Sequence, residues 1–197
     1  MQVPLIRCII AAYISVRSTT MKTRPEPING NNTGILTVRS APLKKLNAAL
    51  KAGFLRHLDD PTIKRTHLFH GRYENIYLDE SHIPELKTLL AEACTHAGYI
   101  LQQNKLHAGC WFNYMPPGSI TLPHRHDDDD ELLSAAYYVD VPANSGDLII
   151  HAREGDITIA PEAGMFVFFR PDVSHEVTEN KSRLDRLSIG INFGIKT

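Results

Sequence analysis

The sequence lacks several features that mark particular protein classes. It has three cysteines, Cys8, Cys94 and Cys110, which lie far apart and form no Cys-x-x-Cys pair. Such a scattered, odd-numbered set predicts reduced thiols and a cytoplasmic location rather than a disulfide framework. The formal net charge of −1 leaves no global basic surface for nucleic acid. The apolar run from Cys8 to Ile14 is too short to span a bilayer, so we expect no membrane partner.

The N-terminal segment has a composition of its own. Its first twenty residues carry two arginines and no acidic residue. This composition is compatible with a transit peptide, and also with a poorly packed strand or with a start of the protein at Met21. Residues 24–34 are rich in proline, asparagine and glycine and predict a linker. We therefore expect an N-terminal extension and linker over residues 1–38 and a single domain over residues 39–197.

Helical periodicity dominates the first half of this domain. In residues 41–54, leucine and phenylalanine recur at helical spacing, with Ser40 as the candidate N-cap. A second helix is predicted to begin at the N-cap Ser81, with Pro84 and Glu85 in its first turn. Its single apolar face indicates packing against another layer, most simply the outside of a sheet.

From about residue 107 the periodicity changes from helical to alternating. Turn sequences such as PPG, NSGD and PEAG separate short runs that are rich in β-branched and aromatic residues. The candidate strands are residues 109–115, 119–126, 134–141, 147–152, 156–161, 165–170, 174–179 and 186–194. Short strands at regular spacing indicate a sandwich, jelly roll or barrel. The sequence therefore predicts helical support over residues 40–105 and a β-rich core over residues 107–195.

Three of the ten histidines have a spacing that suits a metal. His124 and His126 are two residues apart in a candidate strand, so both imidazoles can point to one face; Asp128 shares this parity. His175 begins a distant candidate strand. Two ligands from one strand and one from another give the three-ligand pattern of non-haem iron(II) sites. A surface strand end and a hydrogen-bonded core histidine would leave the same pattern, so the spacing alone does not decide.

The remaining histidines carry no comparable pattern. His67 and His70 are three residues apart in a predicted loop, and we expect them and the others to be structural. The four aspartates of residues 127–130 allow three interpretations. They form a solvated loop, they accept hydrogen bonds from the ligand imidazoles, or they form a negative rim that attracts a basic substrate.

Residues 109–194 resemble the iron(II)- and 2-oxoglutarate-dependent oxygenases, in particular a branch close to the prolyl hydroxylases. The matching pieces occur in the order typical of that family: WFNYMPPGSITLPHRH, LLSAAYYVDVPANSGDLII, IAPEAGMFVFFRPDVSHEV and RLSIGINFG. Each piece alone is weak, and their order carries the resemblance. It implies a mainly β fold with N-terminal helices, whose core is a double-stranded β-helix of the jelly-roll, cupin-like type.

The resemblance also implies roles for single residues. His124 corresponds to the first iron ligand and His175 to the distal one. Arg186 looks like the arginine that binds the far carboxylate of 2-oxoglutarate, a task that suits a planar and permanently charged guanidinium. Further residues that the resemblance implies around the cosubstrate are Ser188, Tyr138, Asn113 and Trp111.

The sequence departs from the family at the second ligand. The usual motif is His-x-Asp or His-x-Glu, whereas this chain has His124-Arg125-His126. Either His126 takes the place of the carboxylate, or the motif is shifted and Asp128 supplies it. The glycine six residues before His124 favours the first alternative. We therefore expect His124, His126 and His175 as ligands, with Asp128 as the rival to His126.

These implications predict an oxidoreductase, a dioxygenase that hydroxylates a C–H bond and converts 2-oxoglutarate to succinate and CO2. Its cofactors would be iron(II) and 2-oxoglutarate, with ascorbate as a candidate reductant. Its partners would be O2 and an unknown small-molecule or peptide substrate, a basic one if the aspartates form a rim. Two alternatives stay open: a cupin-like isomerase or dioxygenase that uses no 2-oxoglutarate, and a non-catalytic metal-binding β-domain.

Overall fold

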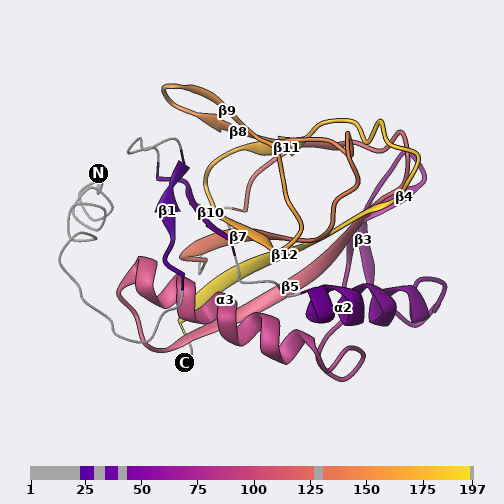
Figure 1. The fold of residues 1–197 in the computed structure, drawn as a ribbon, viewed down its shortest axis with the longest axis horizontal. Helices are drawn as coiled ribbons and strands as arrows, with labels where there is room; N and C mark the ends of the chain where they lie inside the picture. Colours follow the sequence, from indigo (N-terminus) through magenta and orange to yellow (C-terminus); the bar gives the residue numbers. More distant parts are fainter. Residues whose placement is uncertain (1–22, 29–33, 40–43, 127–130, 196–197) are drawn as a thin grey trace.

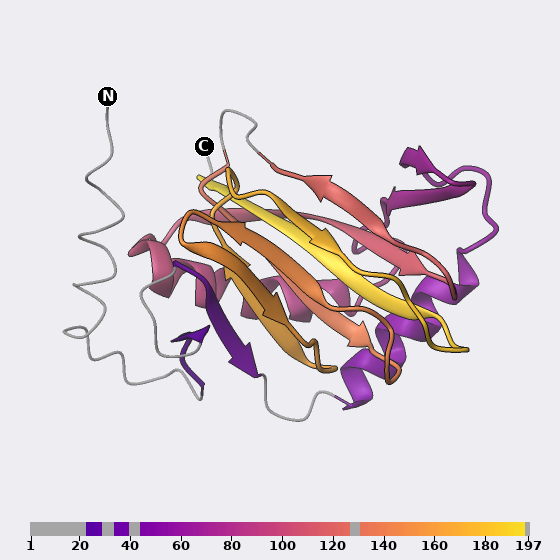
Figure 2. The same ribbon diagram turned by 90° about the horizontal axis from the view of Figure 1, so that it is seen from above.

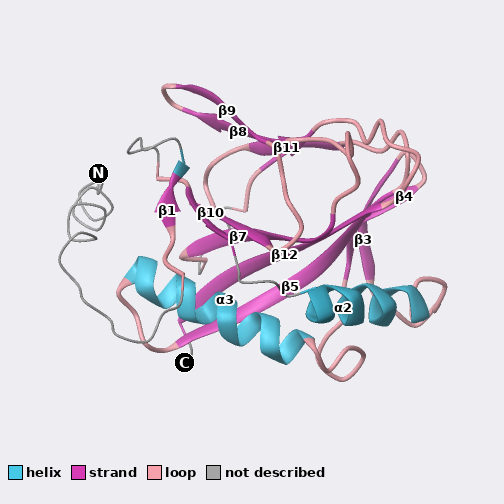
Figure 3. Cartoon of the chain, in the orientation of Figure 1, coloured by secondary structure: helices cyan, strands magenta, loops and turns pink. Residues whose placement is uncertain are grey.

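The computed structural model describes residues 23–28, 34–39, 44–126 and 131–195. Most regular structure in these residues is β, in two antiparallel sheets that lie one above the other (Figure 3). Two helices cover the outer side of the larger sheet, and the smaller sheet lies on its other side (Figure 1). The described part of the chain is therefore mainly β, as the sequence predicts, and its layers are consistent with a jelly roll.

The two sheets are built from strands that are distant in the sequence. The described strands of the larger sheet are, in spatial order, β1 (Glu26–Pro27), β2 (Leu36–Arg39), β10 (Met165–Phe169), β7 (Leu133–Asp140), β12 (Arg186–Ile195), β5 (Leu106–Met115), β4 (Arg72–Ile76) and β3 (Arg65–Phe69). Those of the smaller sheet are β6 (Thr121–His124), β11 (His175–Val177), β8 (Leu148–Ala152) and β9 (Gly155–Ile159). Each of the eight candidate strands overlaps one of these.

The helices are α2 (Lys44–Arg56) and α3 (Leu86–Leu101). Among the described residues, no helix is long and apolar enough to cross a lipid bilayer. β2 pairs with β10 inside the larger sheet, so residues on both sides of the expected boundary at residue 38 belong to that sheet. The division into an extension and a domain stays a prediction.

Strand β12 separates the core from the space between the sheets. It pairs with β5 along its whole length and with β7 on its other side (Figure 2). Successive side chains of a strand point to opposite faces. The odd-numbered residues from Leu187 to Phe193 pack with the helices in the main apolar cluster. The even-numbered residues from Arg186 to Asn192 face the smaller sheet, where they line a cavity.

Strand β10 is buried on both faces, which explains its uninterrupted apolar sequence MFVFF. Phe166 and Phe168 belong to the cluster beneath the helices. Met165, Val167 and Phe169 belong to a second apolar cluster, between the two sheets. One cluster packs the larger sheet against the helices, and the other packs it against the smaller sheet. The second cluster therefore sets the distance between the two sheets.

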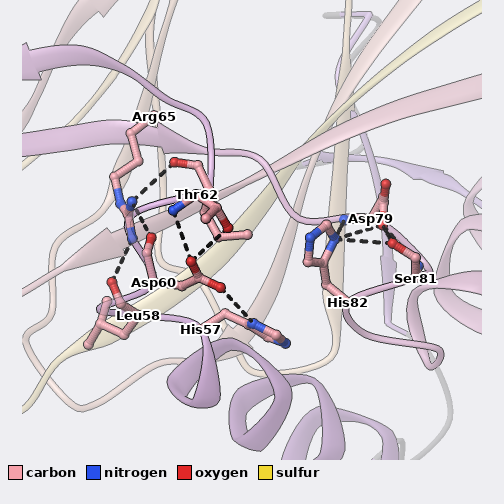
Figure 4. Close-up of polar contacts among 9 residues, drawn as sticks. His57, Leu58, Asp60, Thr62, Arg65, Asp79, Ser81 and His82 are labelled. Atoms are coloured by element: carbon pink, nitrogen blue, oxygen red, sulfur yellow. Dashed lines mark hydrogen bonds and ion pairs between the residues drawn. The ribbon is translucent and has the colours of Figure 1, made fainter.

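The second helix begins later than the sequence predicts. Helix α3 starts at Leu86 after the N-cap Glu85, so the prediction of Ser81 as N-cap was wrong. Asp79 explains the difference, because its carboxylate accepts hydrogen bonds from the backbone N (2.9 Å) and hydroxyl (2.6 Å) of Ser81 and fixes a turn (Figure 4). The Ser81 hydroxyl is the main reason why the pKa of Asp79 is lowered to about 2. Ser40, the other candidate N-cap, lies outside the described residues.

The segment 67–70 lies in a β-hairpin, and the loop predicted there was wrong. Strands β3 and β4 pair around a turn in which His70 and Gly71 have φ angles of 48° and 76°. His67 has a φ of 57° and is not among the paired residues, although the register is the same on either side of it. Because the hairpin is polar and partly exposed, its sequence lacks the runs of apolar residues that indicated strands β5 to β12.

Arg65 fixes the connection between α2 and this hairpin. Its guanidinium donates hydrogen bonds to the backbone oxygens of Leu58 (2.7 Å), Asp60 (2.8 Å) and Ile63 (3.1 Å) (Figure 4). The carboxylate of Asp60 in turn accepts a hydrogen bond from the backbone N of Thr62 (2.9 Å). The base of the hairpin is thereby tied to the end of α2.

Replacement of Phe166 by alanine is expected to lower the free energy of unfolding by about 3–5 kcal/mol, because it leaves a cavity in a packed core. Phe166 is fully buried, and its ring centroid lies 4.5 Å from that of Tyr137. Urea denaturation measures the change. Leu184→Ala is the control, since Leu184 is 66% exposed and its removal should cost less than about 0.5 kcal/mol. Equal losses for both variants would contradict this assignment of the core.

Candidate metal centre

Three imidazoles lie together between the two sheets. His124 is the last residue of β6 and His175 the first residue of β11, and the two are direct partners in the antiparallel pairing of these strands. His126 follows two residues after His124. One ligand atom from each of the three side chains lies within 4.8 Å of the others. The pairing of β6 with β11 thus brings together side chains that are distant in the sequence.

Backbone carbonyls fix the orientation of two of these rings. Nδ1 of His124 lies 2.8 Å from the backbone O of Leu122, and Nδ1 of His175 lies 3.0 Å from the backbone O of Val173. A carbonyl oxygen only accepts, so each Nδ1–H donates and each Nε2 keeps a free lone pair. This is the tautomer in which a histidine binds a metal through Nε2.

His175 stays neutral well below physiological pH. Its burial, followed by the proximity of His124 and His126, lowers the pKa of His175 to about 3. A neutral imidazole is the form that coordinates a metal. At neutral pH a proton therefore does not compete with a metal ion for the lone pair of His175.

A narrow cavity of 60 Å³ extends from the three histidines to Arg186. Arg186 is buried, and its Nη1 donates hydrogen bonds to the backbone oxygens of Ser145 (3.2 Å) and Gly146 (2.6 Å). Its guanidinium carbon lies 5.2 Å from the ring centroid of Tyr138 on the neighbouring strand β7. The cavity thus has an imidazole cluster at one end and a cation at the other.

Two donors at this end of the cavity are unpaired. Nε of Arg186 and the hydroxyl of Tyr138 are buried and have no hydrogen-bond partner among the described residues. Burial raises the pKa of Tyr138, so its hydroxyl keeps the proton that it can donate. Because an unpaired buried donor costs free energy, both atoms fit a bound acceptor such as a carboxylate.

A second cavity, of 560 Å³, opens from the histidines toward the hairpin of β3 and β4. His67 and Tyr77 come from the hairpin side, while Trp111 and Asn113 line both this cavity and the narrow one. A molecule in the open cavity would therefore contact His124 and His126, which also line the narrow cavity, whereas His175 lines only the narrow one.

All predicted site residues that the structure describes meet around the narrow cavity. They are His124, His126, His175, Arg186, Ser188, Tyr138, Asn113 and Trp111. Asp128 lies outside the described residues, together with the rest of the acidic run of residues 127–130. Asp128 as a rival ligand and the run as a negative rim stay predictions.

Arg72 is a residue at this site that the sequence did not reveal. From β4 it donates hydrogen bonds to Oδ1 of Asn113 (3.1 Å), the backbone O of Ile120 (2.6 Å) and Oγ1 of Thr121 (3.2 Å). It also pairs with Glu74 at 3.0 Å. Arg72 thereby links β4, β5 and β6 beside Asn113 and Thr121, which line both cavities. No sequence signal pointed to it, because the hairpin that carries it was itself missed.

The sequence matches no family model and no curated relative. Solved structures share the fold. A prolyl-4-hydroxylase from Pseudomonas putida gives a TM-score of 0.69 at 20% identity, over 97% of this chain and 100% of that one. The epimerase SnoN, in complex with Fe3+ and α-ketoglutarate, gives 0.68 at 15% identity, over 83% and 79%. An oxidoreductase of the 2OG-Fe(II) oxygenase family from Burkholderia pseudomallei gives 0.64 at 15% identity, over 98% and 91%.

The chain therefore has the fold of the iron(II)- and 2-oxoglutarate-dependent oxygenases. The resemblance that the ordered motifs predict is confirmed at the level of the fold. The identities are all low, so the activity and substrates of these proteins are not transferred by the likeness alone.

The stability of the metal-free protein is expected to fall as the pH decreases from about 6.5 toward 3. In this window the unfolded chain protonates His175, whereas the folded protein keeps it neutral down to a pKa of about 3, so each proton taken up favours unfolding. Urea denaturation at a series of pH values measures this slope. His175→Asn removes the group and should flatten the slope above pH 4.5, where most carboxylates stay ionised. Identical slopes for both proteins would contradict the prediction.

Proposed function

We propose that the protein is a non-haem iron(II)- and 2-oxoglutarate-dependent dioxygenase that hydroxylates a C–H bond of its substrate, on a core that is a double-stranded β-helix. The observation that carries the proposal is the cavity that joins the three histidines to buried Arg186. A metal-binding β-domain needs the histidines but not a buried guanidinium at the far end of such a cavity. A cupin-like enzyme without 2-oxoglutarate has no need of it either.

The three histidines would hold iron(II). The donation of Nδ1–H by His124 and His175 to backbone oxygens supports this role, since it leaves Nε2 free for a metal. His126 completes the cluster in place of the carboxylate of related enzymes. Three neutral imidazoles leave the metal centre one charge more positive than two imidazoles and a carboxylate would.

The narrow cavity would bind 2-oxoglutarate. The unpaired donors of Arg186 and Tyr138 support a carboxylate at its far end. Ser188 lies two residues after Arg186 on the same face of β12 and can add a hydroxyl donor. Asn113 and Trp111 would form the wall nearer to the metal.

When bound, iron(II), 2-oxoglutarate and O2 supply the oxidative decarboxylation to succinate and CO2 that drives C–H hydroxylation. The protein's own residues bind and orient these groups and the substrate. The open cavity of 560 Å³ would hold the substrate, a small molecule or a peptide, against His124 and His126. A basic group on the substrate, ascorbate as reductant and a cytoplasmic location belong to the same proposal.

Arg186→Ala is expected to weaken 2-oxoglutarate binding by roughly 100-fold or more, because it removes charge-assisted hydrogen bonds from a buried carboxylate. Calorimetry with the iron-loaded protein measures the affinity, and metal analysis should show unchanged iron. Arg153→Ala, at an exposed position, is the matched control and should bind normally. Succinate formation with iron(II), ascorbate and 2-oxoglutarate tests the activity. A wild-type protein that neither binds 2-oxoglutarate nor forms succinate would refute the oxygenase.

The second ligand is decided by two variants. His126→Ala should lower the affinity for iron by more than about 100-fold, since loss of a direct ligand exceeds the loss caused by a supporting residue. Asp128→Ala should leave the affinity within a few-fold of wild type. Iron content after dialysis against a weak chelator reports both. Iron retained by His126→Ala and lost by Asp128→Ala would make Asp128 the ligand.

A further inference from the structure

The three histidines lie at different places in and beside the smaller sheet, and one of them, His126, contacts Trp111 of the opposite sheet. His124 and His175 lie in paired strands, and each donates its Nδ1–H to a backbone oxygen. His126 lies beyond the end of β6, where its backbone N donates to the backbone O of Pro171 (2.8 Å). Its ring packs against the indole of Trp111, with 5.1 Å between the ring centroids and 46° between the planes. The contact with Trp111 reaches His126 from the opposite sheet.

The indole of Trp111 has a fixed place on that sheet. Trp111 of β5 is the direct partner of Gly190 on β12. A Cβ atom on Gly190 would lie 2.4 Å from Cε2 and Cζ2 of the indole. The φ of Gly190 is not in the positive range, so its backbone conformation does not require glycine. The indole occupies the space above Gly190, and any side chain at position 190 would displace the indole.

The indole of Trp111 is not part of either apolar cluster among the described residues. Trp111 is partly exposed and lies outside both apolar clusters, whereas its neighbour Phe112 is fully buried beneath the helices. Instead it lines the narrow and the open cavity, where it stands against His126. Packing of the core therefore does not account for a tryptophan at this position.

We propose that Trp111 is a positioning residue for His126, and that position 190 is a glycine so that the indole can lie there. An imidazole beyond a strand end has two side-chain torsions to fix, and contact with a large flat ring restricts both. The indole holds the His126 ring near the other two, with ring centroids 5.0 Å from His124 and 5.2 Å from His175. The inference rests on the proposed metal centre and assigns what orients its unusual ligand.

Titration of the metal-free protein with Co(II), followed by the visible spectrum of the bound ion, tests this role without turnover. Trp111→Ala is expected to bind Co(II) about 10- to 100-fold more weakly, the loss typical of a residue that supports a ligand, and with a changed spectrum. Trp111→Phe keeps an aromatic face and should recover most of the affinity and the wild-type spectrum. Tyr73→Ala, which removes an exposed aromatic side chain of β4, is the control and should bind as wild type.

Gly190 gives an independent arm of the experiment. Gly190→Ala should displace the indole and weaken Co(II) binding as Trp111→Ala does. Added to Trp111→Ala, the same change should have little further effect, because the new methyl group meets no indole. Thermal melting of each metal-free variant verifies that it is folded.

Wild-type affinity and spectrum in folded Trp111→Ala would overturn the positioning role and leave the metal centre intact. Equal losses in folded Trp111→Ala and Trp111→Phe would overturn the ring contact as its basis. Additive losses in the double variant would separate Gly190 from Trp111 and refute their coupling. Absence of Co(II) binding by the wild-type protein would refute the proposed metal centre itself, a result distinct from the other three.

Discussion

The alternation of side chains along β12 is the constraint on which the rest of the structure depends. One face of this strand carries Leu187, Ile189, Ile191 and Phe193 into the core beneath the helices. The other face carries Arg186, Ser188, Gly190 and Asn192 toward the smaller sheet. A slip of one residue in its pairing would exchange the two faces, burying a guanidinium in the apolar core and removing it from the cavity. The energy that holds the core in register therefore also holds the cosubstrate end of the proposed site.

The histidine end depends on the smaller sheet, which contributes fewer buried apolar residues than the larger sheet does. β6 and β11 are short, and their pairing places His124 opposite His175. Leu148 and Ile150 of the neighbouring strand β8 pack on the larger sheet in the second apolar cluster. The proposed site thus spans two layers, each fixed by a different cluster. Contacts that cross between the layers, such as that of Trp111 with His126, set the relation between its two ends.

The sequence predicts the parts of this arrangement that follow from regular patterns. Short runs rich in β-branched and aromatic residues between turn sequences marked all eight core strands, and the i, i+2 spacing with a distant partner marked His124, His126 and His175. The hairpin of β3 and β4 was not predicted, because its exposed faces need no apolar side chains. Arg72 lies in this hairpin and was not predicted for the same reason. The start of α3 was misplaced because Asp79, upstream of Ser81, holds the serine in a turn. The contact of Gly190 with Trp111 could not be predicted from the sequence, because it depends on the register between β5 and β12, which no local pattern encodes.

The proposed centre has three neutral imidazoles, where related enzymes have two imidazoles and a carboxylate. This difference changes which interactions bind the metal. A carboxylate would attract the metal over a distance, whereas an imidazole contributes only once its lone pair is aligned, so its orientation carries more of the binding free energy. Protonation competes little, because burial and the neighbouring rings keep His175 neutral until the pH nears its pKa of about 3. At neutral pH His175 therefore has no proton to lose before it binds a metal, and the orientation of the rings becomes the main requirement. Backbone carbonyls restrain His124 and His175, and the indole of Trp111, which lies over Gly190, adds a contact that reaches the His126 ring from the opposite sheet.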